Sequence, residues 1–274
     1  MKKPKNPLLF DKLGVSYTIS AVIMTVTAIS LTLVAASYAY QILEQQRGAT
    51  EFDVAMESIL AFNDALENIA WKPQASRSAR FTISYGQLDL IPNIDLKVNV
   101  TDYSGASYSS STGYIMYRTK TRYVSFGEGY QSYFLGNNRT LSTGAGSYGR
   151  GSIEQDSGWV YMTLSYGVRV MKASTIETNQ GSLTVRINNV DIWIIRMNIT
   201  KWSTNIGDFD LKAKCLDVTT ETRAGPEGNG YDVLNGRCNI AVQLGANPLD
   251  MATIELDGDK VVFNFVIATV HVSV

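Results

Sequence analysis

The hydrophobic positions at the start of the chain form one unbroken run. No charged side chain occurs from Leu13 to Leu43, and no Pro lies between Leu13 and Pro73. A helix needs about 20 apolar residues to cross a bilayer, and this run is about half as long again. The pattern predicts a helix over residues 15–43 that is apolar on every side, a surface that suits either lipid or the interior of a helix bundle.

Polar residues begin to share the helix with a single apolar stripe after Glu44. The apolar residues recur in steps of three and four, which places them on one helical face: Phe52, Met56, Ile59, Phe62, Leu66 and Ile69. Pro73 stops the helix, since a residue before Pro avoids the helical region. Residues 44–72 are therefore predicted to be an amphipathic continuation of the same helix, with its stripe packed on the domain that follows.

Small hydroxyl side chains are scattered through the apolar half of the helix. They are Ser16, Thr18, Ser20, Thr25, Thr27, Ser30, Thr32 and Ser37. Such residues let neighbouring membrane helices approach closely and bond to one another. An equally good interpretation is that they bond to carbonyls of their own helix.

Residues 74–274 show a period of two, which is typical of strands. Val, Ile, Tyr, Phe and Thr dominate short runs between turn residues. The predicted strands are 80–85, 94–101, 114–119, 122–126, 159–172, 182–200, 240–244, 252–256 and 260–274. The run 182–200 is one strand or two strands that meet at Asn188 and Asn189. Asp257 and Gly258 predict a tight hairpin turn. The chain is expected to have an α+β fold, with a long N-terminal helix followed by an antiparallel β-sandwich-like domain.

Two stretches of this domain are rich in Tyr, Ser and Gly and are predicted to be exposed loops. They span residues 103–113 and 143–151. Tyr offers a large contact area while Ser and Gly adapt to a partner, so a contact surface is the alternative interpretation.

Charge gives the helix a direction. Residues 1–12 hold four Lys and one Asp, hence +3, and the rest of the chain carries −4 because the whole chain is −1. Positive residues before an apolar span stay in the cytoplasm. Residues 1–14 are thus a basic cytoplasmic leader, and the β domain is expected outside the cell. The even balance of acidic and basic residues argues against a nucleic-acid partner.

Two features fit an extracellular domain. Cys215 and Cys238 could form a disulfide that closes a loop of about 24 residues and contributes on the order of 3 kcal/mol. A pair of free, buried thiols is the alternative. Asn99, Asn138 and Asn198 each begin a sequence N-x-[ST], the acceptor pattern for N-glycosylation.

No pattern in the sequence indicates catalysis, a metal or a cofactor. The run Gly144–Gly149 matches the dinucleotide fingerprint G-x-G-x-x-G, but neither a strand before it nor a helix after it is predicted. His271 is the only His and is expected to be structural. Asp257 and Asp259 are better explained by a turn than by weak Ca²⁺ binding, because the spacing of a calcium loop is missing. We do not expect an enzyme.

The N-terminus resembles that of archaeal type IV pilin-like proteins, archaellins included. The similarity covers residues 1–71 and lies in Lys12-Leu13-Gly14-Val15-Ser16, in Ile19, in Ala21-Val22-Ile23-Met24 and in the Ser/Thr/Ala-rich run to Tyr40. It implies that a prepilin-type peptidase cuts between Gly14 and Val15. The chain differs from bacterial pilins in having Ile19, not Glu, at the fifth position of the processed chain.

The resemblance implies a structural role. Subunits would wait in the membrane and then assemble, alike or mixed, through their apolar helices into a surface filament whose β-rich heads contact or adhere to other surfaces. The alternative is a permanently anchored, single-pass extracellular binding protein of the cell envelope that keeps its leader. The sequence does not identify the ligand.

Overall fold

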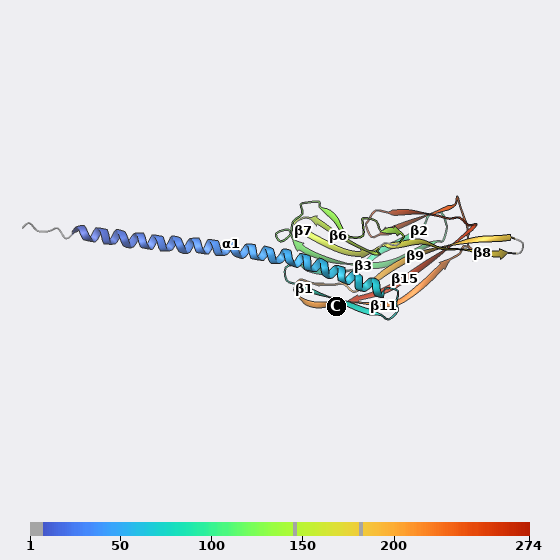
Figure 1. Ribbon diagram of the computed structural model, residues 1–274, viewed down its shortest axis with the longest axis horizontal. Coiled ribbons are helices and arrows are strands. Elements are labelled where there is room, and N and C mark those ends of the chain that lie inside the picture. The colour runs from blue at the N-terminus through green and yellow to red at the C-terminus, as the bar shows by residue number, and fades with distance from the viewer. Residues whose placement is uncertain (1–7, 145–146, 181–182) are drawn as a thin grey trace, which may run out of the picture. The chain divides into compact units, whose positions relative to one another are not determined.

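The computed structural model describes residues 8–144, 147–180 and 183–274. Side chains are described from Tyr17 onward, Gln180 excepted. A single helix, α1 (Leu8–Ile69), is followed by a domain built mostly of strands (Figure 1). Contacts divide the chain into two units, residues 1–47 and residues 48–274, and each unit is described by itself.

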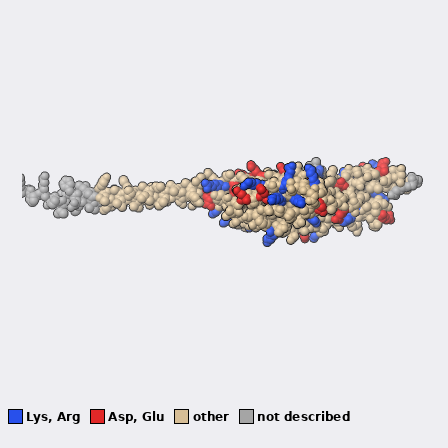
Figure 2. Space-filling view, turned by 90° about the horizontal axis from the view of Figure 1, so that it is seen from below, with Lys and Arg blue, Asp and Glu red and all other residues tan. Residues whose placement is uncertain are grey.

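The described part of the first unit is helical throughout and is apolar to its surface. The side chains from Tyr17 to Leu43 are exposed almost without exception. In the space-filling view this stretch carries neither acidic nor basic atoms (Figure 2). The structure therefore has an N-terminal helix that is long and apolar enough to span a membrane.

The second unit contains the rest of α1 and two curled sheets. Its strands are β1 (Ser76–Ile83), β2 (Gln87–Val100), β3 (Ser107–Lys120), β4 (Gln131–Leu135), β5 (Leu141–Thr143), β6 (Gly149–Asp156), β7 (Trp159–Tyr166), β8 (Val168–Gln180), β9 (Leu183–Ile199), β10 (Trp202–Thr204), β11 (Gly207–Arg223), β12 (Tyr231–Asp232), β13 (Arg237–Leu244), β14 (Asp250–Glu255) and β15 (Lys260–Ser273).

The two sheets differ in the direction of their strand pairs. The seven-stranded sheet has the order β1-β11-β15-β9-β8-β5, with β12 also paired to β15. The eight-stranded sheet has the order β14-β13-β2-β3-β7-β6-β4, with β10 also paired to β2. The antiparallel prediction is confirmed for most pairs. It is wrong for β9 with β15 and for β5 with β8, which run parallel.

The two parallel strands at the centre of the seven-stranded sheet are β9 and β15. Each buries one face of the sheet along its first half and the opposite face along its second half. In β9, Ile192 and Ile194 belong to one hydrophobic cluster, whereas Ile195 and Met197 belong to another. Successive side chains of a strand point to opposite faces, so the buried face changes between residues 194 and 195. β15 makes the same change between its partners Ile267 and Ala268.

Two cores result from this exchange. The helix core contains the buried stripe of α1 and residues of both sheets, including Phe81, Tyr117, Met162 and Val270. Among the described residues, the sheet core contains none from α1, and it also draws on both sheets. The predicted stripe is confirmed, because Phe52, Ile59, Phe62, Leu66 and Ile69 are buried and Met56 packs against them.

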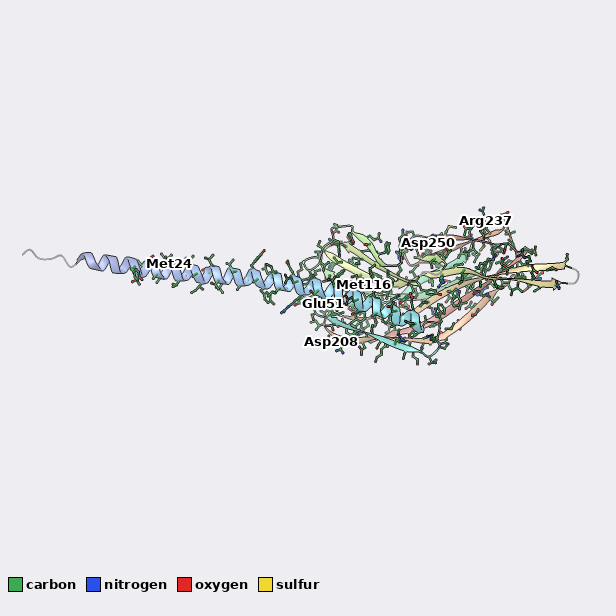
Figure 3. The ribbon with its side chains drawn as sticks, viewed as in Figure 1. Met24, Glu51, Met116, Asp208, Arg237 and Asp250 are labelled. Atoms are coloured by element: carbon green, nitrogen blue, oxygen red, sulfur yellow. The ribbon has the colours of Figure 1, made fainter. Side chains whose placement is uncertain are left out.

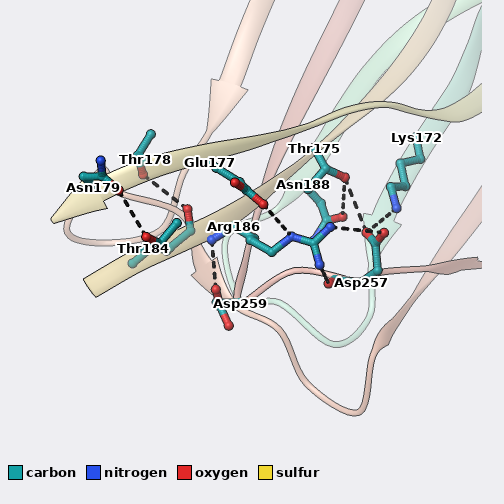
Figure 4. A network of polar contacts seen from close by, with 11 residues as sticks. Lys172, Thr175, Glu177, Thr178, Asn179, Thr184, Arg186, Asn188, Asp257 and Asp259 are labelled. Carbon is teal, nitrogen blue, oxygen red and sulfur yellow. Dashed lines mark hydrogen bonds and ion pairs between the residues drawn. The ribbon is translucent and has the colours of Figure 1, made fainter. Parts of the chain in front are cut away.

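The predicted Asp-Gly hairpin is wrong, because β14 and β15 belong to different sheets. The turn is a crossover held by ionic contacts with the β8–β9 hairpin (Figure 4). Asp257 bonds to Lys172 and lies 4.0 Å from a guanidinium nitrogen of Arg186. Gly258 does not need a left-handed backbone; a Cβ there would lie 2.6 Å from the carbonyl oxygen of Arg186.

Three predicted elements differ in the structure or are decided by it. Residues 107–113, predicted to be a loop, form the first half of β3 because they pair with β2. The predicted strand 122–126 is irregular. The run 182–200 is a single strand, β9, in which Asn188 is fully buried and donates to the carbonyl of Lys260.

Truncation of Phe62 tests the contribution of the helix to its core. Phe62 is fully buried in the helix core, so Phe62→Ala should lower the free energy of unfolding by about 3–5 kcal/mol. Val54 lies on the exposed side of the same helix, and Val54→Ala should cost only about 0.5 kcal/mol. Urea unfolding of the full-length protein in detergent, followed by Trp fluorescence, measures both. Equal losses would show that the stripe does not carry the stability.

Candidate functional site

The exposed apolar part of α1 is the first candidate for function. Side chains such as Tyr17, Met24 and Val34 are more than two-thirds exposed, and a water-soluble surface rarely presents so many large apolar groups together (Met24 is labelled in Figure 3). A surface of this kind is suited to contact with lipid or with other apolar helices.

The hydroxyl groups on this segment bond within the helix. The Thr27 hydroxyl donates to the carbonyl of Ile23 at 2.8 Å, and Thr25, Ser30 and Thr32 make equivalent bonds to carbonyls three or four residues earlier. The second of the two interpretations is thus confirmed for these four residues. Because the hydroxyls are already paired, they add no unsatisfied polar group to an apolar environment.

Glu51 ties the second half of α1 to the turn between β1 and β2. Its carboxylate accepts backbone N–H bonds from Ser84, Tyr85 and Gly86 at 2.7–3.1 Å. It also accepts the hydroxyl of Tyr117 at 2.9 Å (Glu51 is labelled in Figure 3). Burial and the nearby Glu51 charge raise the pKa of Tyr117, so the phenol remains a donor.

Two glycines let aromatic rings reach the same region. A Cβ on Gly86 would lie 2.2 Å from the hydroxyl oxygen of Tyr117, and one on Gly48 would lie 2.5 Å from the ring of Tyr123. Gly normally weakens a helix by about 1 kcal/mol. At Gly48 this cost accompanies a close contact between the helix and an aromatic ring.

A second set of polar contacts joins α1 to the start of β6. The buried Asn63 accepts the hydroxyl of Tyr166 at 3.1 Å, and burial raises the pKa of that phenol. Glu67 accepts the backbone N–H of Gly149 at 3.2 Å and also bonds to Ser147. A Cβ on Gly149 would lie 2.1 Å from Asn63. The last Gly of the G-x-G-x-x-G match is therefore explained by contact with the helix.

The predicted cleavage site lies at the edge of what is described. The backbone of Gly14 and Val15 is helical, as part of α1, while the side chains of residues 8–16 lie outside the described residues. Most of the basic leader, residues 1–7, also lies outside them. Processing between Gly14 and Val15 stays a prediction.

The predicted disulfide is wrong, and both thiols are free and buried. Cys215 lies on β11 in the seven-stranded sheet and donates to the carbonyl of Ala70 at 3.1 Å, just beyond the end of α1. Cys238 lies on β13 in the eight-stranded sheet, within the sheet core. Spacing along the sequence gave no information about this separation.

The three glycosylation acceptors are all exposed. Asn99 lies on β2, Asn138 lies between β4 and β5, and Asn198 lies on β9. Exposure is necessary for modification, and glycosylation of these residues stays a prediction. His271 pairs with Asn198 across β15 and β9, on the face opposite the buried Val270.

The charged groups around the turn at Asp257 and Asp259 are engaged in structure. The Lys172 side chain lowers the pKa of Asp257, and Asp259 accepts the backbone N–H of Arg186 at 2.8 Å (Figure 4). Within the described residues, no three His, Cys, Asp or Glu side chains gather where they could hold a metal ion.

Comparison with known protein families, curated proteins and solved structures finds no match to this chain. The functional argument therefore depends on the residues and their geometry.

Neutralising Glu51 should loosen the attachment of the helix. An amide offers one acceptor to four converging donors, so Glu51→Gln should lower the free energy of unfolding by about 3 kcal/mol. Glu57 is an exposed carboxylate on the same helix, and Glu57→Gln should change the value by less than about 0.5 kcal/mol. Urea titration of both full-length variants provides the comparison. A loss for Glu57→Gln as large as that for Glu51→Gln would contradict the assignment.

The two thiols should be unreactive until the protein unfolds. Burial raises the pKa of Cys238 to about 12 and also raises that of Cys215, so each thiol stays protonated near neutral pH. Without reductant, a maleimide should label neither Cys in the folded protein and both in concentrated guanidinium, as read by mass spectrometry. Absence of label after denaturation would show that the thiols are oxidised.

The raised thiol pKa values also imply a dependence of stability on pH. The model thiol pKa is 9.0, and Cys238 in the folded protein titrates at about 12. Its contribution to stability is complete below the lower value and is lost as pH rises toward the higher one. Cys238→Ala should reduce this alkaline loss of stability, measured as the urea midpoint against pH.

Proposed function

We propose that the protein is a structural subunit of an archaeal type IV pilus-like surface filament, assembled through the apolar part of α1. The observation that carries the proposal is the change of surroundings within α1. Its first part is exposed and apolar, and its later part is the buried stripe of a folded domain. No flexible Gly- or Pro-rich linker separates the two parts.

This arrangement suits an assembly element better than a simple anchor. An anchor needs about 20 apolar residues, and the uncharged run is longer. An all-apolar helix with paired hydroxyls is stable in lipid and is equally stable among other apolar helices, because both surroundings exclude water. One surface can thus serve a subunit stored in the membrane and a subunit packed in a filament.

The β-rich unit would be the head of the subunit. We propose that its two sheets pack as a β-sandwich, a view supported by the hydrophobic clusters that draw residues from both sheets. The contacts of Glu51, Asn63 and Glu67 would transmit force between the head and its own part of the helix. The head would lie outside the cell, where exposed Asn99, Asn138 and Asn198 are accessible for glycosylation.

A permanently anchored extracellular binding protein is the second candidate. It is favoured by an open groove on the eight-stranded sheet, lined by aromatic and polar side chains. Such a protein would keep its leader and stay in the membrane as a single-pass chain.

The processed N-terminus distinguishes the two functions. For a filament subunit, mass spectrometry of protein sheared from native cells should find Val15 as the first residue. A Gly14→Leu variant, which alters the residue before the bond, should keep Met1 and disappear from the sheared fraction. Mature wild-type protein that retains Met1 and stays in the membrane would reject the filament and favour the anchored protein.

A further inference from the structure

The eight-stranded sheet carries a groove on its outer face. The groove has a volume of about 420 Å³, within the range of ligand sites. Side chains of β3, β7 and β6 form its floor, and residues 244–247, at the end of β13 and just after it, form one wall. Met116, in the floor, is labelled in Figure 3. The side chains between them, such as Tyr117 and Met162, point to the helix core.

The strand register orders the floor into rows. Met116, Thr163 and Ser152 lie side by side on β3, β7 and β6. In the rows on either side, Ser165 pairs with Arg150, and Tyr161 pairs with Glu154. Arg150 and Glu154 are four residues apart on β6, so about 13 Å of strand separates their backbone positions.

Arg150 is a cation without a carboxylate partner. No ion pair joins it to an acid in the described part of the chain, whereas Arg118 lies 3.3 Å from Asp89 and Arg139 lies 3.0 Å from Asp250. Its Nε atom is buried and has no hydrogen-bond partner. A terminal nitrogen of Arg150 donates to the hydroxyl of Tyr133 at 3.4 Å, and the guanidinium lies 5.5 Å from the centroid of that ring.

A half-buried guanidinium in this state favours an anionic ligand. A planar carboxylate can take two parallel hydrogen bonds from a guanidinium, and its negative charge would balance the unpaired charge of Arg150. Glu154, toward the other end, would repel a second negative charge; it accepts a bond from Gln131 at 3.1 Å. The groove therefore fits a ligand with an acidic group at one end and a neutral group at the other.

The remaining lining residues match a saccharide. Tyr114 and Tyr161 supply aromatic surface for the C–H face of a sugar ring. The hydroxyls of Ser152, Thr163 and Ser165 can donate and accept, as sugar hydroxyls require. Within the described residues, these three hydroxyls have no hydrogen-bond partner, so they are available to a ligand.

A peptide fits the groove less well. Peptides commonly add a strand to a free sheet edge, or lay an apolar helix into an apolar groove. Here the main chains of β3, β7 and β6 are already paired on the sheet, and the floor mixes charged and hydroxyl groups with its aromatic rings.

We propose that this groove binds an acidic oligosaccharide, with a uronic acid carboxylate on Arg150 and a neutral sugar toward Tyr161 and Glu154. The site gives the β domain a ligand of its own and does not depend on filament assembly. It would allow the domain to recognise acidic polysaccharide on another surface.

The test compares two probes that differ only in charge. The full-length protein in detergent is titrated by calorimetry with an aldobiouronic acid, a uronic acid linked to a neutral hexose, and with the same disaccharide after reduction of its carboxyl group. The acid should bind at least about 10-fold more tightly. Arg150→Gln should remove this difference, and Arg150→Lys should restore only part of it. Tyr161→Ala should weaken both probes.

Arg80→Gln is the matched control, since Arg80 is exposed on β1 of the other sheet. It should leave both affinities unchanged, and the thermal midpoint of each variant confirms that it folds. Equal binding of the two probes, or no binding of either, would overturn the proposal. So would tighter binding of an acidic peptide, or inorganic phosphate that displaces the acid at equal concentration, because either would indicate a different class of ligand.

Discussion

The parallel pairing of β9 with β15 is the interaction on which the β domain depends. The two strands lie at the centre of the seven-stranded sheet and stay in register from Lys260 with Ile187 to Val272 with Ile199. Both strands change the face that they bury at the same pair of residues. The single ladder of hydrogen bonds between β9 and β15 therefore runs through the sheet core and the helix core. A slip of one residue would turn the apolar side chains of both cores to the wrong faces. The register therefore fixes the helix core and the sheet core together.

The helix core gives α1 its place within the second unit. The apolar stripe of α1 supplies the area that is buried against the sheets. Polar residues of α1 then fix where the helix lies along its own axis and how it is rotated about that axis. Glu51 is bound at the turn between β1 and β2, while Asn63 and Glu67 are bound near the start of β6. Contacts of this kind need a single geometry, which hydrophobic burial alone does not impose. The groove lies on the other face of the same strands, so the core that holds the helix also keeps its floor in shape.

Local patterns in the sequence predicted the features that depend on local physics. The uncharged run and the three-four spacing from Phe52 to Ile69 gave the helix and its buried stripe, because helical periodicity is a property of neighbouring residues. The long strand β11 was missed, although Phe209, Leu211, Ala213 and Cys215 alternate with polar residues. Charged residues between them obscured the period of two. Asp-Gly predicted a turn correctly and a hairpin wrongly, since β15 pairs with β9, β11 and β12 and not with β14, which precedes the turn. The disulfide and the groove likewise depend on which strands share a sheet, and no local pattern records that.

The position of β15 has a consequence for the order of events during synthesis. It follows every other described strand along the chain, yet β9 and β11 pair with it on its two sides. The ribosome makes residues 260–273 after the whole of α1 and the other strands, so the sheet cannot close around its centre until then. Until that moment the buried stripe of α1 and the inner faces of β9 and β11 remain without their full packing. A chain interrupted before residue 260 would thus carry the apolar helix but lack the central strand of its sheet, and the apolar surface left exposed would make such a fragment prone to aggregate.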